Sequence, residues 1–211
     1  MPRRVDAAER RREVVDAVKR IVVADGLARV SLREVAGEAD LVVGSVRHYF
    51  ATSSDLLVCA FDDVVDSVLA RVLDASPLGR GAGHPGEEGL VAQLCQLLPL
   101  DEERAVDLCV WSEFKLAART RPELADTAER GHRSLAAALG AAVRSLRPEL
   151  PDEELVVEAE RLLATVEGLG LHAMLQGRWL DAALCSAVVR AQVASLAAAV
   201  PRLSGASTGI H

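Results

Sequence analysis

The sequence predicts an all-α protein of about nine helices. Half of its 211 residues are apolar but only 3% are aromatic, so Ala, Leu and Val must build most of the core. These residues recur three and four positions apart along much of the chain, which is the spacing of an amphipathic helix. The alternation of polar and apolar residues that is typical of strands is scarce. A chain of this length has room for a small domain that leans on a larger one.

The composition argues against membrane, secreted and metal-binding proteins. The sequence has no run of about 18 or more uncharged apolar residues. Its first residues, MPRRVDAAERRRE, lack the apolar segment of a signal peptide. We therefore expect a cytoplasmic protein without membrane contact. The cysteines lie far apart without CxxC or Cys/His ligand spacing, which favours structural thiols over redox or metal roles: Cys59, Cys95, Cys109 and Cys185. No metal or cofactor is expected.

Charge is distributed unevenly along the chain. The formal net charge is −7, which by itself argues against a nucleic-acid partner. Residues 1–50, however, hold ten Lys/Arg against eight Asp/Glu, whereas the remainder holds 14 against 23. A mildly basic head on an acidic body fits a protein that touches DNA with one end only.

The first helix is predicted to begin near Asp6 and to run to about Asp25, where Gly26 ends it. Its apolar stripe is made of residues at helical spacing: Ala7, Val14, Val15, Val18, Ile21 and Val22. Arg3 and Arg4 form a short basic arm before it. The arginines at positions 10–12 crowd its early turns, and they are either a solvated helix face or a contact to a phosphate backbone.

The stretch from Ser31 to Leu57 holds two short helices joined by a tight turn. Ser31 and Glu34 have the spacing of a capping box, in which each side chain takes a free backbone N–H of the first turn. Asp40 marks the break between the helices, and the second one runs to Phe50. This is a helix-turn-helix pattern, and its second helix offers small and hydrogen-bonding side chains to a DNA groove: Gly44, Ser45, Arg47, His48 and Tyr49.

The segment AxEADLVVGSVRHYFATSSDLL resembles the N-terminal domain of the TetR family of bacterial transcriptional regulators. The similarity lies in a turn, a glycine and an aromatic pair that all fall in register. Three positions depart from the family pattern. Asp40 replaces the usual Gly but tolerates a left-handed backbone. Val42 replaces Ser at a helix N-cap, at a cost of about 1 kcal/mol. Ser53 replaces Lys, which puts one phosphate contact in doubt.

The resemblance implies a DNA-binding domain over residues 1–52 and a ligand-binding and dimerisation domain over residues 53–211. Arg47 is the leading base reader, because a guanidinium contacts guanine through two hydrogen bonds. Tyr49 is equally a DNA contact or a core residue. The full set of expected DNA contacts is Arg3, Arg4, Ser31, Arg33, Val43, Gly44, Ser45, Arg47, His48, Tyr49 and Ser53.

In the body, a long helix is predicted to start near Ser53 and to end before Ser76. The segment SPLGRGAGHPG then reads as a flexible loop, and the tail 204–211 as disordered. Further helices are predicted at 87–98, 101–119, 122–146, 152–178 and 182–200. The segment AVDLCVWSEFKLAA is apolar on nearly every side, so it should lie in the middle of the body. The last two helices are rich in Ala and Gly, which permits close packing. They resemble the pair through which TetR-family proteins form a homodimer.

An effector site is predicted inside the body. Glu167 is a carboxylate in an otherwise apolar helical stripe, and burying it unpaired would be costly, so it needs a partner. The candidates are His132, Arg133 and Lys115. Glu167 is then either part of an internal ion pair or dimer contact, or the anchor for a polar or cationic group of an apolar ligand. The expected lining is Phe61, Val65, Cys109, Trp111, Phe114, His132, Glu167, Leu171 and Met174.

The sequence gives no sign of an enzyme. Catalysis would need a nucleophile–base pair, a metal cluster or paired carboxylates in a pocket. None of the five histidines has a second His or a Cys four residues on, and the acidic runs lie at predicted helix N-termini, where the helix dipole explains them. We expect a homodimeric transcriptional regulator that responds to a ligand. The expected form is a repressor that a small molecule releases from a palindromic operator. The alternatives are a regulator that binds DNA without any ligand and an enzyme built on a helical body.

Overall fold

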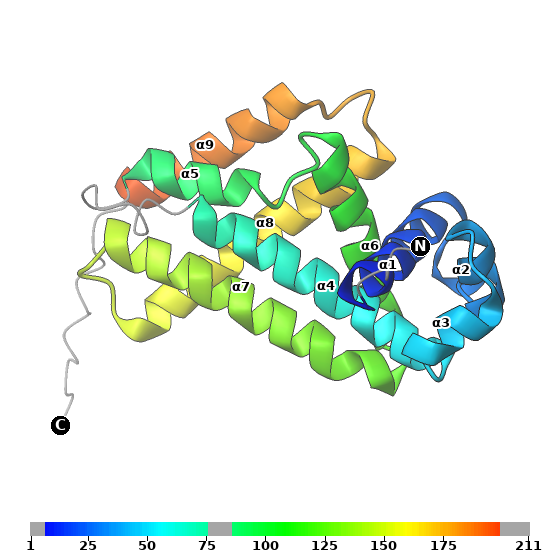
Figure 1. The fold of residues 1–211 in the computed structure, drawn as a ribbon. Helices are drawn as coiled ribbons and strands as arrows, with labels where there is room; N and C mark the ends of the chain where they lie inside the picture. Colours follow the sequence, from blue (N-terminus) through cyan, green and yellow to red (C-terminus); the bar gives the residue numbers. More distant parts are fainter. Residues whose placement is uncertain (1–6, 76–85, 199–211) are drawn as a thin grey trace.

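The computed structural model describes residues 7–75 and 86–198, and within these ranges all regular structure is helical (Figure 1). The prediction of an all-α fold is therefore confirmed. The helices are α1 (Ala7–Asp25), α2 (Leu32–Glu38), α3 (Val43–Tyr49), α4 (Ser53–Asp74), α5 (Glu87–Cys95), α6 (Glu102–Ala118), α7 (Ala125–Leu146), α8 (Asp152–Leu175) and α9 (Ala182–Ala198). Two 3₁₀ turns, η1 (Leu27–Arg29) and η3 (Pro122–Leu124), accompany them. None of the described helices is long and apolar enough to cross a membrane.

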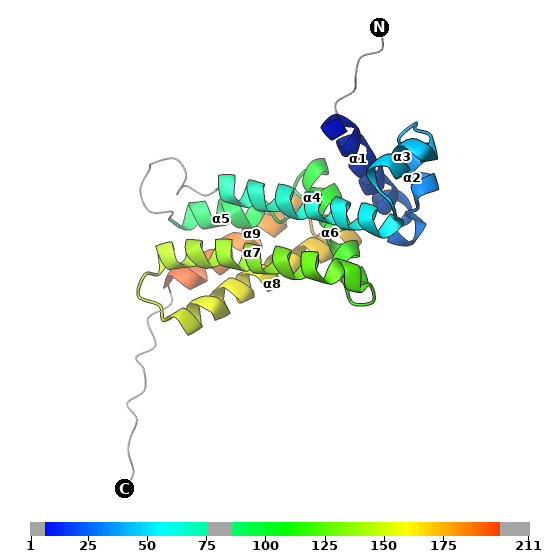
Figure 2. The ribbon, with the colours of Figure 1, turned by 60° about the horizontal axis from the view of Figure 1, so that its bottom comes forward.

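Helices α1, α2 and α3 form a compact head at one end of an elongated body, as Figures 1 and 2 show from two directions. The head is held together by the predicted stripe of α1, which meets Val35 and Ala36 of α2 and Val46 of α3 in the core. Helix α1 also packs against α4 and α6 of the body. The orientation of the head is therefore fixed by contacts to two body helices rather than by a flexible linker.

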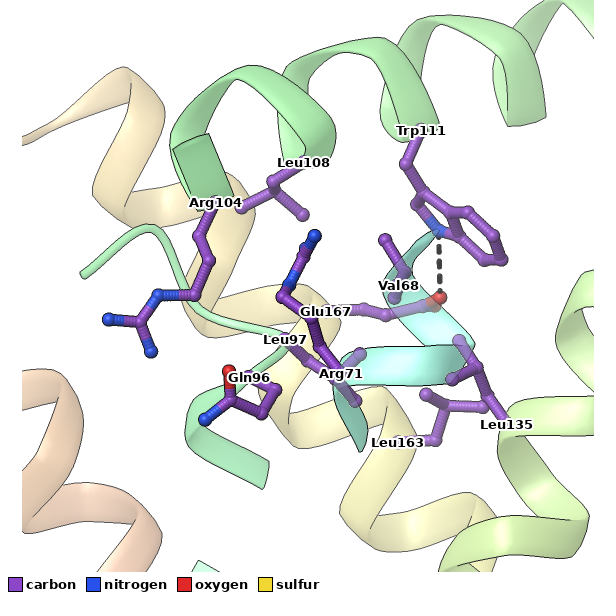
Figure 3. A pocket seen from close by; sticks show the side chains of 10 residues that line it. All are labelled: Val68, Arg71, Gln96, Leu97, Arg104, Leu108, Trp111, Leu135, Leu163 and Glu167. Atoms are coloured by element: carbon purple, nitrogen blue, oxygen red, sulfur yellow. Dashed lines mark hydrogen bonds between the residues drawn. The ribbon is translucent and has the colours of Figure 1, made fainter. Parts of the chain in front are cut away.

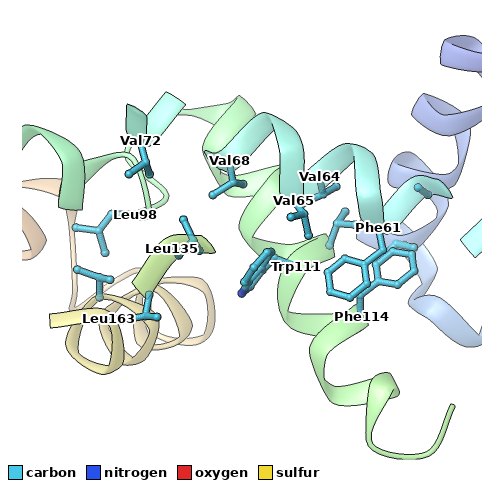
Figure 4. Close-up of a cluster of buried hydrophobic side chains, with 14 of the residues drawn as sticks. Phe61, Val64, Val65, Val68, Val72, Leu98, Trp111, Phe114, Leu135 and Leu163 are labelled. Atoms are coloured by element: carbon cyan, nitrogen blue, oxygen red, sulfur yellow. The ribbon is translucent and has the colours of Figure 1, made fainter. Parts of the chain in front are cut away.

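The body is organised around α6, as predicted for its apolar segment. Phe114 of α6 stacks on Phe61 of α4, with ring centroids 4.8 Å apart, and Trp111 meets Phe61 edge-on at 5.9 Å (Figure 4). Helices α1, α4, α7 and α8 all pack against α6, while α5 packs against α9. The prediction of burial on nearly every side is wrong at Leu116, which is 70% exposed.

Two glycines allow the close helix packing that the small residues predicted. A Cβ atom on Gly131 of α7 would lie 2.7 Å from Cη2 of Trp111, and one on Gly170 of α8 would lie 2.7 Å from a methyl group of Leu108. Real Cβ atoms do not approach other atoms so closely. The flat face of the Trp111 ring and the Leu108 side chain thus occupy space that only glycine leaves free.

Three helices start later or end earlier than predicted, and a proline or glycine lies near each of these ends. The predicted helix 122–146 begins with the 3₁₀ turn at Pro122, and the helix proper starts at Ala125. The predicted helix 87–98 ends at Cys95 and continues as tight turns, since the residue before Pro99 disfavours helical backbone. The predicted helix 152–178 ends at Leu175, in front of Gly177. Of the predicted loop 76–86, Gly86 caps α5, and the rest lies outside the described residues, as do the tail 204–211 and the last residues of the predicted helix 182–200.

Helix caps also differ from the expectation. Only half of the predicted capping box forms at α2: Ser31 Oγ accepts the backbone N–H of Glu34 at 3.2 Å, but the Glu34 carboxylate lies 3.7 Å from Arg29. A complete capping box, which the sequence analysis missed, starts α4. There Thr52 Oγ1 accepts from the backbone of Asp55, and the Asp55 carboxylate accepts from the backbone of Thr52. This box fixes the point at which the chain leaves the head.

Replacing Gly131 by alanine tests the tight contact between α6 and α7. The new methyl group must displace Trp111 or Val65, so we expect the free energy of unfolding to fall by about 1–3 kcal/mol. Gly37→Ala in α2 is the control, because a Cβ there meets open space, and it should raise the free energy of unfolding by up to about 1 kcal/mol. Urea titrations measure both. An unchanged stability of Gly131→Ala contradicts the contact.

Candidate nucleic-acid interface and effector cavity

The turn between α2 and α3 presents α3 at the surface of the head. Asp40 has φ +54°, so the left-handed backbone expected there is confirmed. The N–H of Leu41 closes the turn on the carbonyl of Ala36 at 2.8 Å. Val42 occupies the N-cap of α3 without a side-chain cap, as predicted. Burial of Val46 and Phe50 holds the helix in place despite the missing cap.

The outer face of α3 carries the residues predicted to contact DNA. Gly44, Arg47 and His48 are exposed, while Ser45 and Tyr49 are half-buried. The Tyr49 ring packs on the core and also meets the His48 ring edge-on, with centroids 5.1 Å apart. Tyr49 is therefore placed for both of its predicted roles.

The other described residues that were predicted to contact DNA lie on or next to α2 and at the first positions of α3 and α4. Arg33 is exposed on α2, Val43 and Ser53 are half-buried at the first positions of α3 and α4, and Ser31 serves as the α2 cap. Arg3 and Arg4 lie outside the described residues.

The arginine run on α1 divides into different roles. Arg10 pairs with Glu13 at 2.6 Å. Arg11 lies over the Phe50 ring at 4.9 Å and donates to Cys59 Sγ at 3.1 and 3.3 Å, so it ties the head to α4. Arg11 and Arg12 are exposed, which agrees with a solvated helix face, and the Arg11 guanidinium also serves the junction between head and body; a phosphate contact stays a prediction.

A small cavity opens between α4, α6, α7 and α8, next to the turn that follows α5 (Figure 3). Its free volume is about 20 Å³, roughly the room of one water molecule. Apolar side chains form most of the wall and a few polar ones interrupt it: Val68, Arg71, Gln96, Leu97, Arg104, Leu108, Trp111, Leu135, Leu163 and Glu167. Of the predicted lining, this cavity brings together Trp111 and Glu167.

Lys115 is the partner of Glu167. Its Nζ lies 2.6 Å from Glu167 Oε1, and Trp111 Nε1 donates to the same oxygen at 3.4 Å. The prediction that His132 or Arg133 is the partner of Glu167 is wrong, because each of them contacts a different carboxylate. His132 Nε2 lies 3.0 Å from Glu160, and Arg133 pairs with Glu129. His132 therefore faces α8, but two turns of that helix before Glu167.

The remaining predicted ligand residues lie away from the cavity or behind its wall. Phe61, Val65 and Phe114 are buried in the core. Leu171 is 43% exposed, one residue beyond the point where Leu108 packs on α8 at Gly170. Met174 borders a separate hollow near Cys185.

Cys95, Cys109 and Cys185 lie in surroundings that disfavour the reactive thiolate. All four are free, and burial raises the pKa of the Cys95, Cys109 and Cys185 thiols. A raised pKa lowers the thiolate fraction at neutral pH. Within the described residues, no group of three His, Cys, Asp or Glu side chains is placed to hold a metal ion.

The sequence analysis missed three polar lining residues, namely Arg71, Gln96 and Arg104. Arg104 is held by the Asp101 carboxylate at 2.9 Å and by the carbonyl of Cys95 at 3.0 Å. The hydrogen bonds from Arg104, first from its backbone and then from its side chain, hold the pKa of Asp101 below its ordinary value. Only the positions of these residues in the sequence could have indicated them. Gln96 and Arg104 lie on either side of Pro99, and Arg71 follows the apolar Val68 by one helical turn.

Helices α8 and α9 leave apolar side chains in solvent. Val156, Val157 and Leu175 of α8 are 59%, 62% and 71% exposed, and Trp179 after α8 is 80% exposed. Leu184 adds a further exposed apolar side chain on α9. Large apolar side chains gathered on neighbouring elements are typical of a surface that another protein covers.

Known proteins share this architecture. A family model described as the C-terminal region of BetI-type transcriptional repressors matches residues 86–198. The HTH-type transcriptional regulator PksA of Bacillus subtilis (strain 168) is 31% identical over 182 residues, which cover 83% of this chain and 83% of PksA.

Solved structures give the same result. A transcriptional regulator from Rhodococcus sp. RHA1 is 28% identical with a TM-score of 0.78, over 88% of this chain and 95% of the other. The multidrug binding protein EbrR, crystallised with ethidium, is 30% identical with a TM-score of 0.64, over 89% of this chain and 98% of EbrR.

Proposed function

We propose, from the premise that this chain belongs to the TetR family of transcriptional regulators, that it is a homodimeric repressor released from a palindromic operator by a small molecule. The observation that carries the proposal is the separation of two sites on one rigid framework. Helix α3 exposes Gly44, Arg47 and His48 at the tip of the head, while the Trp111–Glu167 cavity lies within the body. Residues 1–52 act as the DNA-binding domain, and residues 53–211 bind the effector and the second subunit.

Arg47 reads a base in the major groove. It is exposed on the last turn of α3, and its guanidinium matches the two acceptors of guanine. Gly44 lets the start of α3 approach the groove closely, and Ser45, His48 and Tyr49 contact phosphates or base edges beside it. Ser31, Arg33, Val43 and Ser53, with the arm Arg3–Arg4, contribute to the same interface.

Arg47→Ala should weaken binding to the preferred operator by about 1–3 kcal/mol and relax the preference at one base position. Selection of binding sites from random duplex DNA supplies the operator, and fluorescence anisotropy gives the affinities. Arg133→Ala is the matched control, because Arg133 is exposed on α7 in the body and should leave operator binding unchanged. If Arg47→Ala instead lowers the affinity equally for duplexes of every sequence, Arg47 contacts a phosphate and not a base.

The second subunit packs on α8 and α9. These helices carry the exposed apolar residues Val156, Val157, Leu175 and Leu184, and one short recognition helix offers too few contacts for specific binding alone. A twofold dimer places two copies of α3 on half-sites about one helical turn apart, roughly 34–36 Å.

Val157→Glu should break this dimer, because it puts a charge into the apolar interface. Light scattering should give twice the 22.4 kDa of one chain for the unmodified protein and a lower mass for the variant. Leu116→Glu is the control, since Leu116 is 70% exposed on α6 and lies outside the proposed interface. A single-chain mass for the unmodified protein, together with full operator affinity, would rule out the dimer.

The effector binds beside Trp111 and Glu167. Ethidium, which EbrR binds, is an aromatic cation, and a carboxylate next to an indole suits a polar or cationic group on an apolar ligand. Because the cavity holds about 20 Å³, a larger ligand must move the side chains around it. A metabolite screen for release of the operator duplex identifies the effector.

Glu167→Gln separates the two interpretations of this carboxylate. If Glu167 anchors the effector, the variant should keep its fold and operator affinity and yet need far more effector for release. If the Lys115–Glu167 pair is only structural, the melting temperature should fall whether or not effector is present. Thermal unfolding and operator release measure these outcomes, and an unchanged effector response in a folded dimer would remove Glu167 from the site.

A further inference from the structure

A buried carboxylate links the cavity to the head. Asp107, in the middle of α6, is 4% exposed and accepts a hydrogen bond from Arg71 Nη1 at 2.6 Å. Its other oxygen lies 3.7 Å from Nζ of Lys19 on α1, and this ammonium also pairs with Asp63 of α4 at 2.7 Å. These four side chains form one chain of ion pairs that runs from the cavity through α6 to the first helix of the head.

Arg71 is the end of this chain that lines the cavity (Figure 3). Among the described residues, its Nε atom is buried and donates no hydrogen bond. A buried N–H group without an acceptor is unfavourable, so an oxygen brought by a ligand would stabilise it. A guanidinium binds a carboxylate best, through two parallel hydrogen bonds. Arg104 belongs to the same lining but is already paired with Asp101, so the unused donor lies on Arg71.

We propose that the effector presents a carboxylate to Arg71, and that this contact reaches the head through Asp107 and Lys19. The inference rests on the proposed function and deepens it. A carboxylate at Arg71 Nε leaves Nη1 on Asp107 but shares the positive charge of the guanidinium, so Asp107 is less well neutralised. Because Asp107 is buried, it needs another cation and draws the Lys19 ammonium away from Asp63. Lys19 belongs to α1, so α1 shifts against α4 and changes the angle at which α3 meets DNA.

A double-mutant cycle tests the connection without any ligand. Among the described residues, Arg71→Met leaves Lys19 as the one cation beside Asp107, next to the Ser67 hydroxyl at 3.5 Å, which should shift α1 and weaken binding of the selected operator duplex. In a Lys19→Met background, Arg71→Met should change the operator affinity little, because position 19 then has no ammonium that Asp107 can attract. We expect a coupling of at least about fivefold in the dissociation constant. Fluorescence anisotropy measures all four proteins, and circular dichroism confirms that each is folded.

The second arginine of the cavity gives the matched control. Arg104→Met removes a charge from the same lining but has no link to Lys19, so its cycle with Lys19→Met should be additive within about twofold. If Arg71→Met does not fold, Arg71→Gln takes its place, since it also removes the charge but keeps a polar side chain at the same position. Additive effects of positions 71 and 19 overturn the connection. A failure of the unmodified protein to bind any duplex overturns the proposed function instead.

The carboxylate is tested with 4-aminobenzoate and its neutral amide, 4-aminobenzamide, by calorimetric titration of the full-length protein. Both offer an amino group to Glu167 on a flat ring, and only the first brings a carboxylate. We expect 4-aminobenzoate to bind at least about tenfold more tightly. Arg71→Met should abolish the difference, and Arg104→Met should retain it. Equal affinities, no heat from either compound, or a difference that survives Arg71→Met overturns the carboxylate assignment.

Discussion

The packing of α6 against four other helices is the constraint on which this structure depends. With few aromatic residues available, the body places Trp111 and Phe114 on α6, where Phe114 stacks on Phe61 of α4 and Trp111 meets the same ring edge-on. The same helix carries the buried Asp107, whose ion pairs reach α4 and α1. Apolar packing and charge pairing thus converge on one helix, so a displacement of α6 affects the cavity and the head together.

The parts of the fold that the sequence predicts are those set by local interactions. The period of apolar residues places the helices, and Asp40 marks the turn before α3 because its backbone tolerates the left-handed conformation. Val46 and Phe50 then determine which face of α3 is buried and, by exclusion, which side chains face outward. The predicted outer face of α3 needs no information from distant parts of the chain, and for that reason the sequence is sufficient there.

The cavity depends on how helices cross, which periodicity does not encode. The period of apolar residues predicts that Glu167 and His132 each lie on the inward face of their own helix. It does not predict that Lys115 lies nearer to Glu167 than His132 does. Arg71 was missed because a charged residue near a helix end normally reads as solvated, whereas here Asp107 holds it at the cavity. The stripe on α8 also stops being internal beyond Gly170, so Leu171 emerges into solvent.

The tight packing around the cavity makes ligand binding and head orientation inseparable. Trp111 rests on the backbone of α7 at Gly131, and Leu108 rests on α8 at Gly170, so neither side chain has free space behind it. A ligand larger than the roughly 20 Å³ cavity can enter only by moving α6 or its neighbours, because close-packed cores change between discrete arrangements. Helix α6 contacts α1 directly. Under the proposed function, an effector that favours the open arrangement alters the affinity of the head for DNA, and DNA then alters the affinity for that effector by the same factor.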